Sequence, residues 1–191
     1  MLFNNILILA ALGALVMILV GRTWQYRAAG LAITNLIAFI LILQIWPVAL
    51  ASVKLISGWI SVILISSSQI SRQTSSESVT PRSAAIFQLL ITLLVWIVIT
   101  AAANSFNQWL PIPYTNLYIG LIIIAAGLIF ASVSQEIFDV IIGVLILLAG
   151  FDIIYSSLEG SALVTGIYSL IVIFIALLNT YFSSDHDEVE E

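Results

Sequence analysis

The chain has 191 residues, of which 62% are hydrophobic and only 8% are charged, and its mean hydropathy is +1.20. Its net charge of −5 comes largely from the last seven residues, Asp185 to Glu191, and gives no reason to expect binding to nucleic acid. The absence of cysteine excludes disulfides, thiol nucleophiles and thiolate metal sites, and no polar stretch is long enough to form a soluble domain.

The apolar runs are long enough to cross a bilayer as helices. A hydrocarbon core of about 30 Å requires roughly 20 apolar residues in a helix. Barrel strands would alternate apolar and polar residues over about 10 positions, whereas Leu117 to Val133 is apolar on nearly every side. We therefore predict an all-α polytopic membrane helix bundle that forms a single transmembrane domain over residues 1–182. Its seven helices are expected at about residues 3–20, 29–46, 48–66, 85–105, 115–133, 137–157 and 161–182.

The second and third predicted helices come from one long apolar stretch. Leu31 to Ser66 is nearly continuous and too long for a single crossing. Trp46-Pro47 divides it almost in half, and proline both breaks a helix and restricts the residue before it. A tight hairpin at this point gives two helices of about 18 residues, each just sufficient to span the membrane.

The arginines predict the orientation of the bundle. Arg22 and Arg27 lie in the first connection, and Arg72 and Arg82 lie in the third. With a hairpin at Pro47 the two pairs share one side of the membrane, and basic residues accumulate on the cytoplasmic side. We therefore expect seven crossings, an outside N-terminus and a multi-pass protein of the cell inner (plasma) membrane.

Two polar segments are expected to project into the cytoplasm. The serine-rich stretch Ser67 to Ser83 is typical of a flexible connection. Residues 183–191 predict an acidic, disordered cytoplasmic tail. Within this tail Asp185-His186-Asp187 offers three adjacent metal-type ligands, but a solvated tail is the simpler interpretation. No metal site and no cofactor are therefore expected.

Lys54 and Asp152 are the two ionisable residues placed well inside predicted spans. Such residues are functional candidates, because burying a charge in the membrane is costly. Lys54 follows the outer start of its helix, and Asp152 precedes the outer end of its own. At about 1.5 Å per residue both lie roughly 8–9 Å below the outer boundary. Equal depth and opposite sign predict an ion pair, which could be a proton relay or purely structural, unless the lysine snorkels to the interface.

Three further acids lie near the ends of the sixth predicted helix. Glu136 and Asp139 begin this helix, where carboxylates favour the macrodipole and cap free N–H groups. Glu159 follows the helix in an outer connection. It is most simply a solvated acid, although a proton exit beside Asp152 is the alternative, so it is included among the ion-pathway candidates.

Uncharged polar and small residues within the spans predict close helix packing. Asn35, Gln44 and Gln88 are interpreted first as hydrogen-bonding partners between helices and second as pathway lining. Gly143 and Gly150, with the small run at residues 125–127, offer surfaces for close approach. Whether the neighbouring helix belongs to this chain or to another subunit is left open.

Two regions of the chain resemble membrane subunits of complex I and its hydrogenase relatives. The first runs from Tyr26-Arg27 through the hairpin to Val53-Lys54-Leu55-Ile56 and resembles the N-terminal half of hydrogenase-4 component E. The second is similar to the C-terminal half of that component and to the small K-type (4L-like) subunit. It comprises Gly127-Leu128-Ile129, Ser134-Gln135-Glu136-Ile137-Phe138, Ile142-Gly143 and Ala162-Leu163-Val164-Thr165-Gly166-Ile167.

The chain departs from this family at the acidic positions. K-type subunits resemble one another in carrying buried glutamates on the proton path. Aligned on Ile142-Gly143, the first such position falls at Leu145, and the region of the second, residues 167–172, also contains no acid. The resemblance therefore implies either a scaffold of the membrane arm or a transfer of the proton role to Lys54 and Asp152.

The expected function is that of a non-catalytic integral subunit in a larger complex I-like, hydrogenase-type or cation-antiporter-type assembly. It would support ion translocation, with the lipid bilayer and other antiporter-like membrane subunits as its partners. The alternative is a stand-alone small ion or solute transporter or channel that uses Lys54, Asp152 and the amides within the spans. An enzyme is the least favoured class, because the only histidine lies in the tail and acid–base pairs are lacking.

Overall fold

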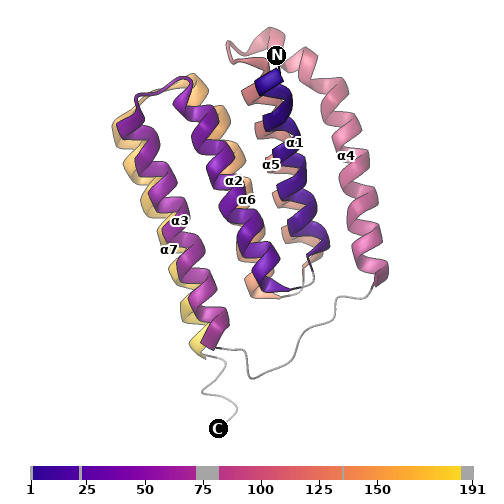
Figure 1. Cartoon of the computed structure of the whole chain (residues 1–191), viewed down its shortest axis with the longest axis vertical. Coiled ribbons are helices and arrows are strands. Elements are labelled where there is room, and N and C mark those ends of the chain that lie inside the picture. Colours follow the sequence, from indigo (N-terminus) through magenta and orange to yellow (C-terminus); the bar gives the residue numbers. More distant parts are fainter. Residues whose placement is uncertain (1, 22, 72–81, 135, 186–191) are drawn as a thin grey trace.

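A computed structural model describes residues 2–21, 23–71, 82–134 and 136–185, and these residues form seven helices (Figure 1). The all-α prediction is confirmed. The helices are α1 (Leu2–Val20), α2 (Trp24–Leu43), α3 (Val48–Ser71), α4 (Arg82–Trp109), α5 (Tyr114–Val133), α6 (Ile137–Leu158) and α7 (Ala162–Asp185).

Several helices extend beyond the apolar runs that predicted them. The second helix begins at Trp24 rather than near residue 29, so Arg27 belongs to its first turn and not to a connection. Ser67 to Ser71 are helical, and the hydroxyls of Ser67 and Ser68 donate to the carbonyls three residues earlier. The last helix continues to Asp185, three residues into the predicted tail. Backbone hydrogen bonding does not require apolar side chains, so a helix can continue past the end of an apolar run.

The remaining parts of the two predicted polar segments, residues 72–81 and 186–191, lie outside the described residues, as do Arg22 and Arg72.

The predicted hairpin at Pro47 is confirmed. Helix α2 ends at Leu43, and the carbonyl of Pro47 accepts hydrogen bonds from the backbone N–H groups of Leu50 and Ala51. Pro47 therefore stands directly before α3, where a missing backbone N–H interrupts no helical hydrogen bond.

The helices form two layers of three, with α4 at one edge (Figure 1). Helices α1, α2 and α3 make one layer, and α5, α6 and α7 make the other. Across the layers α1 contacts α5, α2 contacts α6 and α3 contacts α7, and the two members of each pair run in the same direction. Successive helices alternate in direction, so α2 and α4 begin at the same end of the bundle (Figure 1). The predicted placement of Arg27 and Arg82 at one end is therefore confirmed.

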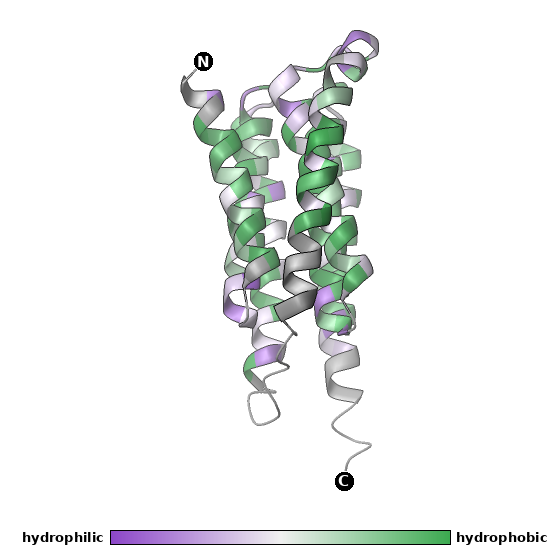
Figure 2. Ribbon diagram, turned by 90° about the vertical axis from the view of Figure 1, so that its right-hand side faces the viewer, coloured by the Kyte–Doolittle hydropathy of each residue, from purple (hydrophilic) through white to green (hydrophobic). Residues whose placement is uncertain are grey.

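Apolar residues cover most of the length of the bundle, and polar residues concentrate toward its ends (Figure 2). Among the described residues six helices, α2 to α7, are long and apolar enough to cross a membrane. The chain is therefore a multi-pass integral membrane protein with about six spans. The apolar stretch of α1, Ile6–Leu19, is shorter, and its crossing of the membrane stays a prediction.

Glycines allow α5 and α6 to approach closely. A Cβ atom added to Gly127 would lie 2.5 Å from the backbone nitrogen of Leu147 and 2.7 Å from the carbonyl oxygen of Gly143. A Cβ atom added to Gly150 would lie 2.7 Å from backbone atoms of α5. The predicted close-packing surfaces are therefore confirmed, and the neighbour that the sequence left open is a helix of the same chain.

Replacing Gly127 by alanine tests this contact, because the added methyl group meets backbone atoms that cannot move without separating α5 from α6. We expect Gly127→Ala to lower the free energy of unfolding by about 1–3 kcal/mol, the usual range for overpacking. The control is Gly166→Ala on α7, where an added Cβ meets nothing within 4 Å. Alanine favours a helix over glycine, so the control should unfold at the same or a higher temperature. Equal midpoints for the two variants in detergent would contradict the close approach.

Candidate functional site

Two buried acids on α6 organise the candidate site. Asp139 lies in the first turn of this helix and Asp152 lies toward its other end, and each is only 4% exposed. At about 1.5 Å per residue the two are separated by roughly 20 Å along the helix. Each forms an ion pair with a basic residue of the opposite layer. Helix α6 is therefore tied to α2 near one end and to α3 near the other.

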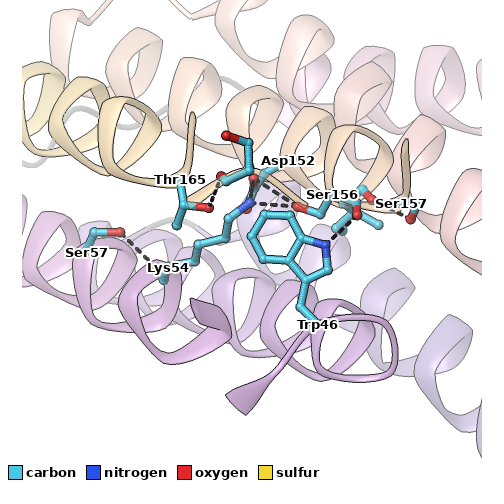
Figure 3. Close-up of polar contacts among 9 residues, drawn as sticks. Trp46, Lys54, Ser57, Asp152, Ser156, Ser157 and Thr165 are labelled. Atoms are coloured by element: carbon cyan, nitrogen blue, oxygen red, sulfur yellow. Dashed lines mark hydrogen bonds and ion pairs between the residues drawn. The ribbon is translucent and has the colours of Figure 1, made fainter. Parts of the chain in front are cut away.

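Lys54 and Asp152 form the ion pair that their equal depth predicted (Figure 3). The ammonium of Lys54 donates to Oδ1 of Asp152 and to Oγ of Ser156, the latter at 2.7 Å. Ser156 lies one turn after Asp152 on α6 and is itself buried. The lysine thus has two acceptors on one helix, which offsets part of the penalty for removing its charge from water.

Two aromatic rings enclose the ammonium of Lys54. Nζ lies 4.5 Å from the ring centre of Trp46 and 5.3 Å from that of Tyr168. The indole N–H of Trp46 donates to the carbonyl oxygen of Ser156 at 2.8 Å, so the hairpin turn is held over the ion pair (Figure 3). Lys54 is only 6% exposed, and the alternative of a snorkelling lysine is wrong. Favourable cation–π contacts add to the stability of the buried ammonium.

Arg27 and Asp139 form a second buried ion pair. Nη1 of Arg27 donates to both oxygens of the Asp139 carboxylate, and Nε donates to the carbonyl oxygen of Gly21 at 3.2 Å. The guanidinium carbon lies 5.7 Å from the ring centre of Phe130. The arginine therefore joins the end of α1, the start of α2 and the start of α6.

This second pair is a correction to the sequence analysis. Arg27 was expected in a connection, and Asp139 was interpreted with Glu136 as a cap for the free N–H groups of the sixth helix. Glu136 is the N-cap residue but its side chain makes no capping hydrogen bond, and Asp139 is directed to Arg27. Both members of the pair lie in the first turn of their helices. Like Lys54 and Asp152, these two residues have opposite charges at similar depths along the bundle, so the same argument would have predicted their pairing.

Glu159 is not part of either ion pair. It lies at the end of α6, is exposed and accepts a hydrogen bond from the hydroxyl of Tyr155 at 3.0 Å. It stands about two helical turns beyond Asp152. This position agrees with a solvated acid, and the role of a proton exit stays a prediction.

The three amides predicted inside spans have different outcomes. Asn35 packs against α3 at Gly58, where an added Cβ would lie 2.7 Å from the amide carbon, in agreement with a role in helix packing. The prediction for Gln44 is wrong: α2 ends at Leu43, so Gln44 is exposed in the hairpin turn. Gln88 belongs to α4, but its side chain lies outside the described residues.

The sequence analysis missed a buried polar face between α3 and α7. Its polar residues are separated by four and seven positions on α3 and by four and ten on α7, spacings that keep them near one face of each helix. The amide of Asn179 donates to the hydroxyl of Ser68 at 2.9 Å across this interface. The other buried members are Ser57, Ser61, Thr165 and Ser169.

Within the described ranges no three His, Cys, Asp or Glu residues gather closely enough to hold a metal ion. His186 and Asp187 of the weak tail motif lie outside these ranges.

Comparison with known proteins gives no match: no family model, no curated protein and no solved structure is similar to this chain.

A double-mutant cycle tests the coupling between Lys54 and Asp152. Lys54→Met or Asp152→Leu alone leaves an uncompensated buried charge and should lower the free energy of unfolding by about 3–5 kcal/mol. The double variant replaces the pair by apolar side chains and should recover most of this loss. Denaturant unfolding in detergent measures all four proteins. Losses that simply add in the double variant would contradict a coupled pair.

The Arg27–Asp139 pair can be tested by replacing Arg27 with lysine. A lysine keeps the charge but cannot bind both carboxylate oxygens of Asp139 and the carbonyl of Gly21 together. We expect Arg27→Lys to lower the free energy of unfolding by about 1.5–3 kcal/mol, the range for hydrogen bonds to charged groups. In an Asp139→Asn background the same change should have a much smaller effect. An equal effect in both backgrounds would show that Asp139 does not recognise the guanidinium.

Proposed function

We propose that this protein is a non-catalytic integral subunit of a larger ion-translocating membrane assembly of the complex I, hydrogenase or cation-antiporter kind. In this proposal it crosses the cell inner membrane seven times, with its N-terminus outside and the Arg27 end of the bundle toward the cytoplasm. The observation that carries the proposal is the buried ion pair between Lys54 of α3 and Asp152 of α6. The pair lies within the apolar length of both helices and joins the two layers of the bundle.

A buried carboxylate and ammonium in contact can respond to a proton without a large change of net charge. As an ion pair they are neutral together. A proton that binds the Asp152 carboxylate makes it a neutral acid and deprives Lys54 of its counter-ion, so the ammonium then favours release of its own proton. Ionisable residues inside spans mark proton relays for this reason. Ser156 and the rings of Trp46 and Tyr168 hold the lysine in place for such an exchange.

The resemblance to hydrogenase-4 component E and the K-type subunits supports a place in a multi-subunit assembly. Leu145, which occupies the first glutamate position of K-type subunits, is a buried core residue here. Under the proposal the titratable role passes to Asp152, about two turns further along α6, and to its partner Lys54 on α3. The short connections between the described helices, such as residues 44–47 and 159–161, leave the membrane spans as the main surface for companion subunits.

Purification of the native protein in mild detergent tests the assembly. We expect it to elute in a large complex together with antiporter-like membrane subunits, identified by mass spectrometry. A lone monomer without redox or antiporter subunits would contradict the proposal. Ion exchange by liposomes that contain only this chain would instead support the stand-alone transporter.

The role of the pair is tested within the intact complex by the variant Lys54→Met/Asp152→Leu, which keeps the interface apolar and filled. Ion translocation should fall by about a hundredfold or more, the loss typical of removing a positioned proton-transfer group. The control is Ser132→Ala, which removes an exposed hydroxyl from α5 and should leave translocation unchanged. A fully active double variant would show that the pair is structural only.

A further inference from the structure

Three buried hydroxyl groups, those of Ser57 and Ser61 on α3 and of Ser169 on α7, lie on neighbouring helices within about two turns of Lys54, toward the Arg27 end of the bundle, which we call inward. The two helices are parallel, and their buried residues follow nearly the same spacing. The hydrogen bond between Ser68 and Asn179 sets their register. Because parallel helices rise equally per residue, Ser169 lies between the levels of Ser57 and Ser61, about one turn inward of Lys54.

Ser169 carries a buried hydroxyl without a partner. Its side chain is one of three among the described residues that hold a buried polar atom lacking any hydrogen bond, and the residue is only 8% exposed. An unpaired hydroxyl in an apolar interior is unfavourable unless something satisfies it. The group therefore indicates a ligand rather than tight packing alone.

The hydroxyls of Ser57 and Ser61 complement this group. Each donates to a carbonyl of its own helix, Ser57 to Lys54 at 3.0 Å and Ser61 to Gly58 at 2.6 Å. Their oxygen lone pairs remain able to accept, while Ser169 can donate. One small molecule that both donates and accepts would satisfy all three groups.

We propose that Ser57, Ser61 and Ser169 form a buried water-binding site between α3 and α7. Buried water in proteins makes on the order of three hydrogen bonds to groups that would otherwise be unsatisfied, which matches these three hydroxyls. The site extends the polar surroundings of Lys54 toward the inner end of the bundle. Its inward limit is an apolar layer formed by Ile65 and Ala176, beyond which lies the Ser68–Asn179 contact.

The water supplies a proton acceptor and donor next to Lys54, and this role in translocation rests on the proposed function. In that role the water extends the proton path from Lys54 toward the inner end of the bundle. The apolar layer then separates this water from the polar groups at that end. Binding of the water itself depends only on the three hydroxyls.

The absence of cysteine in this chain allows a direct infrared test. A single Ser169→Cys variant in liposomes gives one S–H stretching band. If water occupies the site, the band shifts to the lower frequency of a hydrogen-bonded thiol and is lost to the S–D band in D2O. The control is Ala176→Cys, buried about two turns inward on the same face of α7 in the apolar layer, whose band should stay at the free position and persist. A Ser169→Cys band that behaves like the control overturns the proposal.

The sign of a stability change gives a second, independent test. If the Ser169 hydroxyl binds water, Ser169→Ala removes a hydrogen bond and shifts the unfolding midpoint downward. If the hydroxyl is dry and unpaired, its removal shifts the midpoint upward. Ser132→Ala on α5, whose exposed hydroxyl donates to its own helix, is the control and should leave the midpoint unchanged. An upward shift for Ser169→Ala overturns the proposal.

Both tests use the isolated chain and do not measure translocation. Failure of the subunit proposal therefore leaves the infrared and stability results interpretable. Conversely, a dry Ser169 would remove the water site and leave the role of Lys54 and Asp152 to be decided by the complex itself.

Discussion

Two ion pairs across the layers are the constraint on which this bundle depends. Both acids belong to α6 and both basic residues belong to the opposite layer, so each charge is neutralised only when the two layers meet in one register. Lipid chains are as apolar as the side chains of the spans, so burial from lipid drives helix association weakly. An uncompensated charge in this environment is costly, and the pairs therefore select one arrangement of α2 and α3 against α6.

Close packing and the hairpin turn support these pairs. The glycine contacts bring α5 against α6, which positions the helix that carries both acids. At the Lys54–Asp152 pair, the indole N–H of Trp46, in the turn after α2, donates to the carbonyl of Ser156, and its ring covers the ammonium of Lys54. The proline that separates α2 from α3 therefore also determines where the indole lies. The Lys54–Asp152 pair is thus linked to the turn, to α3, to α6 and to Tyr168 of α7.

The two buried ion pairs differ in the chemistry of their basic residue and in its surroundings. One guanidinium nitrogen of Arg27 donates to both oxygens of Asp139 while a second donates to a backbone carbonyl, an arrangement suited to a fixed structural link. Lys54 has a titratable partner and lies beside the buried serines of the α3–α7 interface, which an apolar layer separates from the Ser68–Asn179 contact. The chemistry of the two ends therefore differs: a guanidinium stays charged, whereas an ammonium can release a proton. This difference is why the proposed role in ion translocation falls on the Lys54–Asp152 pair.

Apolar length and the position of Pro47 were enough to establish seven helices, the hairpin and the ends at which Arg27 and Arg82 lie, and equal depth was enough to pair Lys54 with Asp152. The same sequence misplaced Arg27 and Gln44, because the end of an apolar run does not mark the end of a helix. It placed Asp139 correctly but gave it a capping role, because Arg27 was assigned to a connection and not to α2. It also could not show that α3 contacts α7, or that the buried hydroxyl of Ser169 on α7 lacks a hydrogen-bond partner. Periodicity reveals which residues share a face of a helix, but only packing in three dimensions decides which other helix that face meets.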